Sequence, residues 1–143
     1  MRGYWGKPQE TQEALRGGWL HTGDLGRLDQ EGYLYLVDRK KDMIISGGEN
    51  VYPREVEEVL NLHPGVSEAA VVGFPDERWG EKVVAYIVAG KGCSLSQEEL
   101  EKHCRKSLAG YKCPKDYFFV EELPKTPTGK ILKRALRKEA ASP

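Results

Sequence analysis

Residues 66–74 read Val-Ser-Glu-Ala-Ala-Val-Val-Gly-Phe, and residues 82–89 read Lys-Val-Val-Ala-Tyr-Ile-Val-Ala. Their apolar and β-branched composition predicts two strands. A helix is expected before the first strand and another after the second, so that strands alternate with helices of about 10–13 residues. This order predicts an α+β fold, in which a small sheet is flanked by helices.

The two flanking helices have recognisable starts. Pro53 is suited to the first turn of a helix, and the acidic residues of 55–58 favour its positive N-terminal end. The run Ser96-Gln97-Glu98-Glu99 fits a capping box, and we expect Gly110 to close that helix in the left-handed conformation. Residues 117–120 are predicted to form a last strand, and a basic helix is expected to start at Lys130.

Residues 1–38 differ from the rest because glycines punctuate them. A helix is expected at about residues 9–16, with Thr11 as its N-cap. Residues 19–24 are expected to be a strand followed by a turn, residues 29–32 a hairpin turn and residues 33–37 a strand. The charged run of residues 38–42 follows, and we expect a new domain to begin there.

Composition limits the class of protein. The chain has 143 residues and no net charge, 39% of its residues are hydrophobic and 31% are charged. These values are typical of a soluble globular protein. No apolar run is long enough for a transmembrane helix, which takes about 18 residues. The three cysteines suggest neither a disulfide framework nor a zinc site, no metal ligands are assigned, and we expect a cytoplasmic protein.

The neutral total conceals an uneven distribution. Residues 61–100 carry a net charge of −3, whereas residues 101–143 carry +6 from eleven basic and five acidic side chains. Such a basic end can face phosphates, nucleic acid or an acidic partner, or it can be only a solvated helix face. A non-catalytic binding module with a basic tail is therefore one interpretation, although the interleaved aromatic residues of a nucleic-acid surface are absent from this end.

Three loops carry residues of types that take part in binding or catalysis. In Thr22-Gly23-Asp24 a carboxylate follows a glycine, as in sites that bind ribose hydroxyl groups, or it is a simple turn residue. In Ser46-Gly47-Gly48 the glycines permit close approach of a ligand, or they only end a hairpin. In Thr128-Gly129-Lys130 the lysine can stabilise negative charge on a phosphate, or it is only an exposed lysine.

Taken together, the three loops resemble the carboxy-terminal part of an acyl-CoA synthetase of the adenylate-forming superfamily. The resemblance rests on residues 18–24 (GWLHTGD), 38–57 (DRKKDMIISGGENVYPREVE) and 124–131 (PKTPTGKI) and covers the whole chain. It implies that residues 1–38 are the β-rich end of a large AMP-binding domain and that residues 39–143 are a small mobile domain. Such an enzyme converts a carboxylic acid, here expected to be a fatty acid, and MgATP into an acyl-adenylate, and transfers the acyl group to coenzyme A.

The resemblance also assigns roles to single residues. Asp24 and Arg39 match residues that hold the ribose of the nucleotide, and Lys41 falls at the hinge about which the small domain turns. Lys130 matches the catalytic lysine of the adenylation step.

The remaining assignments concern the thioester step. Gly47 and Gly48 match a glycine loop that lines the channel for the pantetheine arm of CoA. Tyr111 and Lys115 match positions that contact the CoA nucleotide. The run Trp79-Gly80-Glu81 is common in the same family, but the resemblance gives it no role.

The resemblance further implies that 143 residues are a piece of a longer enzyme. The phosphate-binding loop and the acid pocket belong to the large domain, which is the expected partner together with ATP, CoA and the acid; no nucleic-acid partner is expected. The chain alone is therefore expected to be inactive. An adenylation domain that acts on a carrier protein is the alternative within the superfamily.

Overall fold

The computed structural model describes residues 1–139, and it divides the chain into two compact units between Lys41 and Asp42. The expected start of a new domain lies three residues earlier, at Arg39.

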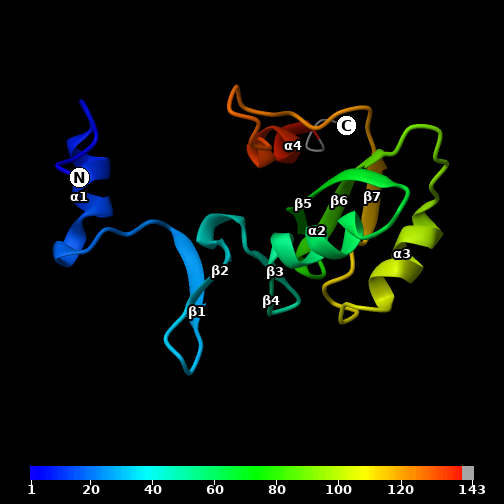
Figure 1. Ribbon diagram of the computed structural model, residues 1–143, viewed down its shortest axis with the longest axis horizontal. Coiled ribbons are helices and arrows are strands. Elements are labelled where there is room, and N and C mark those ends of the chain that lie inside the picture. The colour runs from blue at the N-terminus through cyan, green and yellow to red at the C-terminus, as the bar shows by residue number, and fades with distance from the viewer. Residues whose placement is uncertain (140–143) are drawn as a thin grey trace. The chain divides into compact units, whose positions relative to one another are not determined.

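The first unit, residues 1–41, contains helix α1 (Pro8–Ala14), the 3-10 turn η1 (Arg16–Gly18) and the strands β1 (Asp24–Leu28) and β2 (Leu34–Arg39). β1 and β2 form an antiparallel hairpin whose turn includes the expected residues 29–32 (Figure 1). The prediction of a strand at residues 19–24 is wrong, because residues 19–23 are irregular and β1 begins only at Asp24.

The expected N-cap of the first helix is also wrong. Thr11 lies inside α1, which begins after Lys7 with a proline in its first turn. The Thr11 hydroxyl donates to the Lys7 carbonyl oxygen at 2.7 Å and accepts the Tyr4 N–H at 2.9 Å. The threonine thus fastens the preceding loop to the helix instead of starting the helix.

The second unit is built around a five-stranded sheet. Its strands run in the order β4 (Glu49–Val51), β3 (Ile44–Ser46), β6 (Gly80–Ala89) and β5 (Val66–Asp76), and β7 (Asp116–Phe119) pairs in parallel with β6. β5 and β6 form a long antiparallel hairpin that pairs from Val66 opposite Ala89 to Asp76 opposite Gly80. The expected strands 66–74 and 82–89 are the central parts of this hairpin.

Successive residues of the hairpin enter two different cores. One core, the α2-side core, contains Val71, Ala85 and Ile87 and is covered by helices α2 (Pro53–Asn61) and α3 (Gln97–Arg105). The other, the α4-side core, contains Val72 and Tyr86 and is covered by helix α4 (Lys133–Glu139) and the segment leading to it (Figure 1). Because strand side chains alternate between faces, an almost continuous apolar run serves both cores. The expected small sheet flanked by helices is confirmed.

Two helix ends differ from expectation. α3 has the expected N-cap, with the Ser96 hydroxyl oxygen accepting the Glu99 N–H at 3.2 Å, but it ends at Arg105. Gly110 does not adopt the left-handed conformation expected of a cap, since the helix has already ended before it. α4 begins at Lys133 and not at Lys130, because the chain from residue 125 to residue 131 first folds back on itself through a bridge between Lys125 and Ile131.

Glu57 of α2 connects three elements of this unit. Its Oε1 atom accepts the backbone N–H of Val71 in β5 at 2.8 Å and lies 2.7 Å from Nζ of Lys133 in α4. Both charged side chains are less than one-fifth exposed, at 17% and 16%. Because β5 pairs along only one edge within the described residues, Glu57 covers an N–H group that would otherwise be open to a foreign strand.

None of the helices in residues 1–139 has the length and apolar character that a membrane crossing requires.

The stability of the second unit should depend on α2 packing against the sheet. Leu60 is fully buried in the α2-side core, whereas Leu62 just beyond the helix is 77% exposed. We expect Leu60→Ala to lower the free energy of unfolding by about 2–5 kcal/mol, through lost burial and the cavity left behind. Leu62→Ala is the matched control and should change it by less than about 0.5 kcal/mol. Urea unfolding measures both, and equal effects would contradict this packing.

Candidate functional site

Asp24 and Arg39, the predicted ribose-binding residues, face each other across the first hairpin. The register of β1 and β2 places them opposite one another, and Nε of Arg39 lies 3.8 Å from Oδ1 of Asp24. Both side chains are substantially exposed. A carboxylate and a guanidinium at one accessible position can together accept from and donate to vicinal hydroxyl groups.

Lys41, the predicted hinge residue, is the last residue of the first unit and is exposed. The next residue, Asp42, is held within the second unit, where its Oδ1 atom lies 3.2 Å from Nη2 of Arg137 in α4. The firmly anchored part of the second unit therefore starts directly after Lys41.

Gly47 and Gly48 form the two-residue turn between β3 and β4. Ser46 pairs with Glu49, and the two glycines between them have φ angles of +61° and +84°. Two positive φ angles suit the tight hairpin turns that match strand twist. The hairpin interpretation of these glycines is therefore correct, and it leaves an exposed stretch of backbone without side chains.

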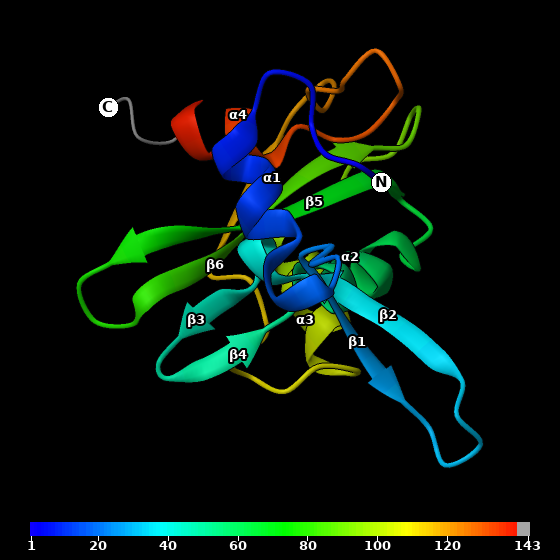
Figure 2. The same cartoon turned by 90° about the vertical axis from the view of Figure 1, so that its left-hand side faces the viewer.

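Trp79 lies against this turn and was given no role by the sequence. Its carbonyl oxygen accepts the Gly47 N–H at 2.8 Å. The Nζ atom of Lys115 lies 5.7 Å from the centroid of its ring, and the guanidinium of Arg78 lies 4.9 Å from it. The turns at the ends of β3–β4 and β5–β6 project to the same side (Figure 2). The structure thus brings Lys115 and Gly47 close to the same tryptophan.

Tyr111 lies in the same loop as Lys115 and is partly exposed. The intervening Lys112 has its Nζ atom 5.9 Å from the Tyr111 ring centroid, and it forms a hydrogen-bonded ion pair with Glu55 of α2 at 2.6 Å. The hydrogen bond to Glu55 raises the pKa of Lys112 above its ordinary value. The loop is therefore fastened to α2 through Lys112.

Cys113, between the two predicted CoA contacts, points away from the surface. It is buried in the α2-side core together with Cys104, and burial raises the pKa of both thiols, to about 11 for Cys104. Neither thiol offers a reactive thiolate near neutral pH.

Lys130, the predicted catalytic lysine, is exposed near the tip of a tight loop. Its backbone N–H donates to the Thr126 hydroxyl oxygen at 3.1 Å, and its carbonyl oxygen accepts the Thr126 N–H at 2.8 Å. Gly129, with φ of +81°, allows the reversal. Within residues 1–139 the structure gives the Lys130 ammonium no hydrogen-bond or ion-pair partner, so the loop holds its backbone and leaves the charge free.

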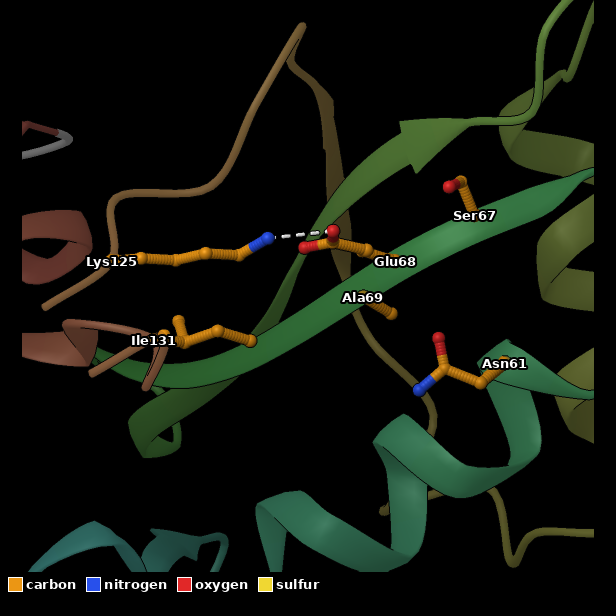
Figure 3. A pocket seen from close by; sticks show the side chains of 7 residues that line it. Asn61, Ser67, Glu68, Ala69, Lys125 and Ile131 are labelled. Atoms are coloured by element: carbon orange, nitrogen blue, oxygen red, sulfur yellow. Dashed lines mark hydrogen bonds and ion pairs between the residues drawn. The ribbon is translucent and has the colours of Figure 1, made fainter. Parts of the chain in front are cut away.

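An ion pair fastens the base of this loop to the sheet. Nζ of Lys125 lies 2.7 Å from Oε1 of Glu68 in β5, above a shallow pocket that Asn61, Ala69 and Ile131 also line (Figure 3). Ile131 is partly buried against the α4-side core. Sequence patterns did not identify Glu68 or Lys125, because they lie 57 residues apart and meet only in the folded chain.

The two groups of candidate residues lie at opposite ends of β5. The Lys130 loop is attached at Glu68, near the start of the strand, whereas Oδ1 of Asp76 at its end accepts the Trp79 N–H at 2.9 Å. Glu68 and Asp76 are eight positions apart along the extended strand, which corresponds to roughly 26 Å. The structure therefore does not bring Lys130 and the Gly47–Gly48 turn into one site.

Residues 55–130 match the family of AMP-binding enzyme C-terminal domains, and the chain belongs to that family. It is 55% identical over 139 residues to a long-chain-fatty-acid–CoA ligase of Bacillus subtilis, covering 97% of this chain and 25% of the relative. It is 52% identical to the fatty acid–[acyl-carrier-protein] ligase ScoC of Streptomyces coeruleorubidus, covering 94% of this chain and 26% of the relative.

The fold agrees with this assignment. The o-succinylbenzoate CoA synthetase MenE of Bacillus subtilis, solved with its acyl-adenylate intermediate, is 44% identical with a TM-score of 0.90. The similarity covers 96% of this chain and 28% of that structure. The chain thus spans only about a quarter of the length of the relatives that it matches.

The Gly47–Gly48 turn should tolerate side chains poorly. Gly47→Ala would force an alanine into the left-handed backbone conformation and would place its Cβ 2.9 Å from Cε3 of Trp79. The backbone strain alone is expected to lower the free energy of unfolding by about 1–2 kcal/mol. Gly110→Ala is the control, because Gly110 has no positive φ and a Cβ added there would meet no atom within 4 Å beyond its chain neighbours. Urea unfolding in which both alanine variants are equally stable would contradict the described turn.

Proposed function

We propose that the chain is the mobile C-terminal part of an AMP-forming acyl-CoA ligase. Such an enzyme activates a carboxylic acid with ATP and then transfers the acyl group to CoA. The observation that carries the proposal is that the Lys130 loop and the Gly47–Gly48 turn are attached at opposite ends of β5, where Glu68 and Asp76 are roughly 26 Å apart along the strand. One compact unit with two distant surfaces suits an enzyme whose small domain presents each surface in turn.

The Lys130 surface would serve acyl-adenylate formation. When the carboxylate oxygen attacks the α-phosphorus of ATP and pyrophosphate leaves, negative charge builds up on the phosphate oxygens, and an ammonium group without a competing partner stabilises it. Asp24 and Arg39 would hold the ribose of the same nucleotide. Mg²⁺ would enter as part of the MgATP substrate.

The opposite surface would serve thioester formation. The bare backbone of Gly47 and Gly48 would line the narrow channel for the pantetheine arm. Lys115 and Tyr111, in the loop beside Trp79, would contact the CoA nucleotide, because a cation suits its phosphates and an aromatic ring suits its base.

Lys41 would be the hinge between these two states. We retain residues 1–38 as the end of the large domain and residues 39–143 as the mobile domain, with the rotation at Lys41. The ion pair of Asp42 with Arg137 supports this position, because it holds the chain within the second unit immediately after the hinge.

The acid is expected to be a fatty acid, in keeping with the name of the 55% identical relative. The acceptor has a second candidate, a carrier protein, which the name of ScoC favours. A nucleic-acid partner is not proposed. Among the described residues, five basic side chains of the C-terminal segment 101–143 form ion pairs within the chain, which reduces the positive charge open to phosphates; these are Arg105, Lys112, Lys125, Lys133 and Arg137.

Lys130→Ala should separate the two half-reactions. The test enzyme is the Bacillus subtilis relative with its matching last quarter replaced by this chain. We expect pyrophosphate exchange driven by a long-chain fatty acid to fall by about 10²-fold or more, the effect of losing a charge-stabilising group. Transfer to CoA from a supplied acyl-adenylate should stay within about two-fold, because Lys130 would then be far from the reacting atoms.

Lys91→Ala removes another exposed lysine and should leave both half-reactions unchanged. An equal loss of both steps in Lys130→Ala would refute the assigned role.

The 143-residue chain by itself should form no acyl-adenylate. Each of its candidate surfaces supplies only part of a nucleotide or CoA site, and the acid pocket of such an enzyme would belong to the large domain. Incubation with ATP, labelled pyrophosphate and a fatty acid should give no exchange above a protein-free control, whereas the fused enzyme should be active. Exchange by the isolated chain would contradict the proposal.

A further inference from the structure

The run Trp79-Gly80-Glu81 contacts one segment, the β3–β4 hairpin, through all three of its residues. Trp79 contributes both backbone and ring: its carbonyl oxygen accepts the Gly47 N–H at 2.8 Å, and its ring lies so close that a Cβ on Gly47 would be 2.9 Å from Cε3. Trp79 thereby fixes the first glycine of the turn.

Within residues 1–139, Gly80 is the one residue of β6 that stands in register with β3. It lies opposite Ser46 in the antiparallel register of β3 and β6. Its φ of +76° lets the chain bend sharply from the preceding turn into β6, which a residue with a side chain rarely does.

Glu81 extends this single pairing with its side chain. Its Oε2 atom accepts the Ile45 N–H at 2.9 Å, at the next position along β3. Gly73 of β5 provides the room, because a Cβ there would lie 2.9 Å from Oε1 of the same carboxylate. The structure thus contains a space, free of any side chain on β5, in which the Glu81 carboxylate lies.

The physical need for this bond follows from the shortness of β3 and β4. Each has three residues, and an isolated hairpin of this size is not stable in water. A hydrogen bond to an ionised carboxylate is shorter and stronger than one to a neutral acceptor. The position of the Gly47–Gly48 turn therefore depends strongly on Glu81.

We propose that Trp79-Gly80-Glu81 is a positioning motif for the Gly47–Gly48 turn and that Glu81 is a positioning residue for transfer of the acyl group to CoA. The step at which it acts rests on the proposed function. Glu81 touches neither substrate directly. It holds β3 so that the glycine backbone keeps the shape of the channel wall, and small displacements of such walls cost large factors in rate.

Amide hydrogen exchange on the 143-residue chain tests the anchoring itself. Glu81→Ala should raise the exchange rate of the Ile45 and Gly47 amides by about ten-fold or more, because Ile45 loses its acceptor and Gly47 loses the support of the anchored β3 strand. The amides of Ala85 and Ile87 in the centre of the sheet should not change. Glu81→Gln, which keeps an acceptor of the same length, should give a smaller effect at Ile45.

The fused enzyme described above tests the catalytic consequence. We expect Glu81→Ala to lower kcat for acyl transfer from a supplied acyl-adenylate to CoA by about ten-fold or more, with pyrophosphate exchange within about two-fold of the parent. Glu81→Gln should recover part of the loss. Glu77→Ala is the matched control, since Glu77 is exposed in the adjacent turn and has no hydrogen-bond or ion-pair partner within residues 1–139.

Equal losses in both half-reactions, no loss in either, or unchanged exchange at Ile45 would each overturn the positioning role. A parent fusion that carries out neither half-reaction would refute the proposed function instead, and the exchange data on the isolated chain would still decide whether Glu81 anchors the turn.

Discussion

The antiparallel pairing of β5 with β6 is the interaction on which the second unit depends. Ten register positions, from Val66–Ala89 to Asp76–Gly80, hold together two strands whose side chains enter separate cores on the two faces. The helices α2, α3 and α4 and the strands β3 and β7 are attached directly to this hairpin, and β4 is attached through β3. α2 and α3 cover one face, α4 covers the other, and the short β3 and the parallel β7 pair with β6.

A stiff hairpin also determines where the candidate residues can be. The Lys130 loop is attached near one end of β5 by the Lys125–Glu68 ion pair, and the Gly47–Gly48 turn is attached at the other end through Trp79 and Glu81. Because the strands between them cannot bend freely, the two surfaces remain apart in any position of the unit. A division of labour between two half-reactions is consistent with that constraint.

Charged side chains in this chain mostly fasten elements to one another. Glu57 joins α2, β5 and α4, Lys112 joins its loop to Glu55, and Arg137 holds Asp42 beside the predicted hinge. In the folded chain, ion pairs therefore offset part of the net charge of +6 that residues 101–143 carry in the sequence. Lys130 differs from these residues because the structure pairs its backbone and leaves its ammonium without a partner among residues 1–139.

Local patterns in the sequence determined the strands of the β5–β6 hairpin, the Ser96 cap and the glycine turn, because alternation, capping and positive φ angles are decided within a few residues. The sequence failed where distant contacts compete with local preference. Lys130 lies in a loop and not in a helix, because Lys125 pairs with Ile131 and Glu68. The strand expected before Asp24 is absent as well. Only the tertiary structure could reveal the role of Trp79-Gly80-Glu81, since its partners Ile45 and Gly47 lie more than thirty residues away and are brought near by the pairing of β3 with β6.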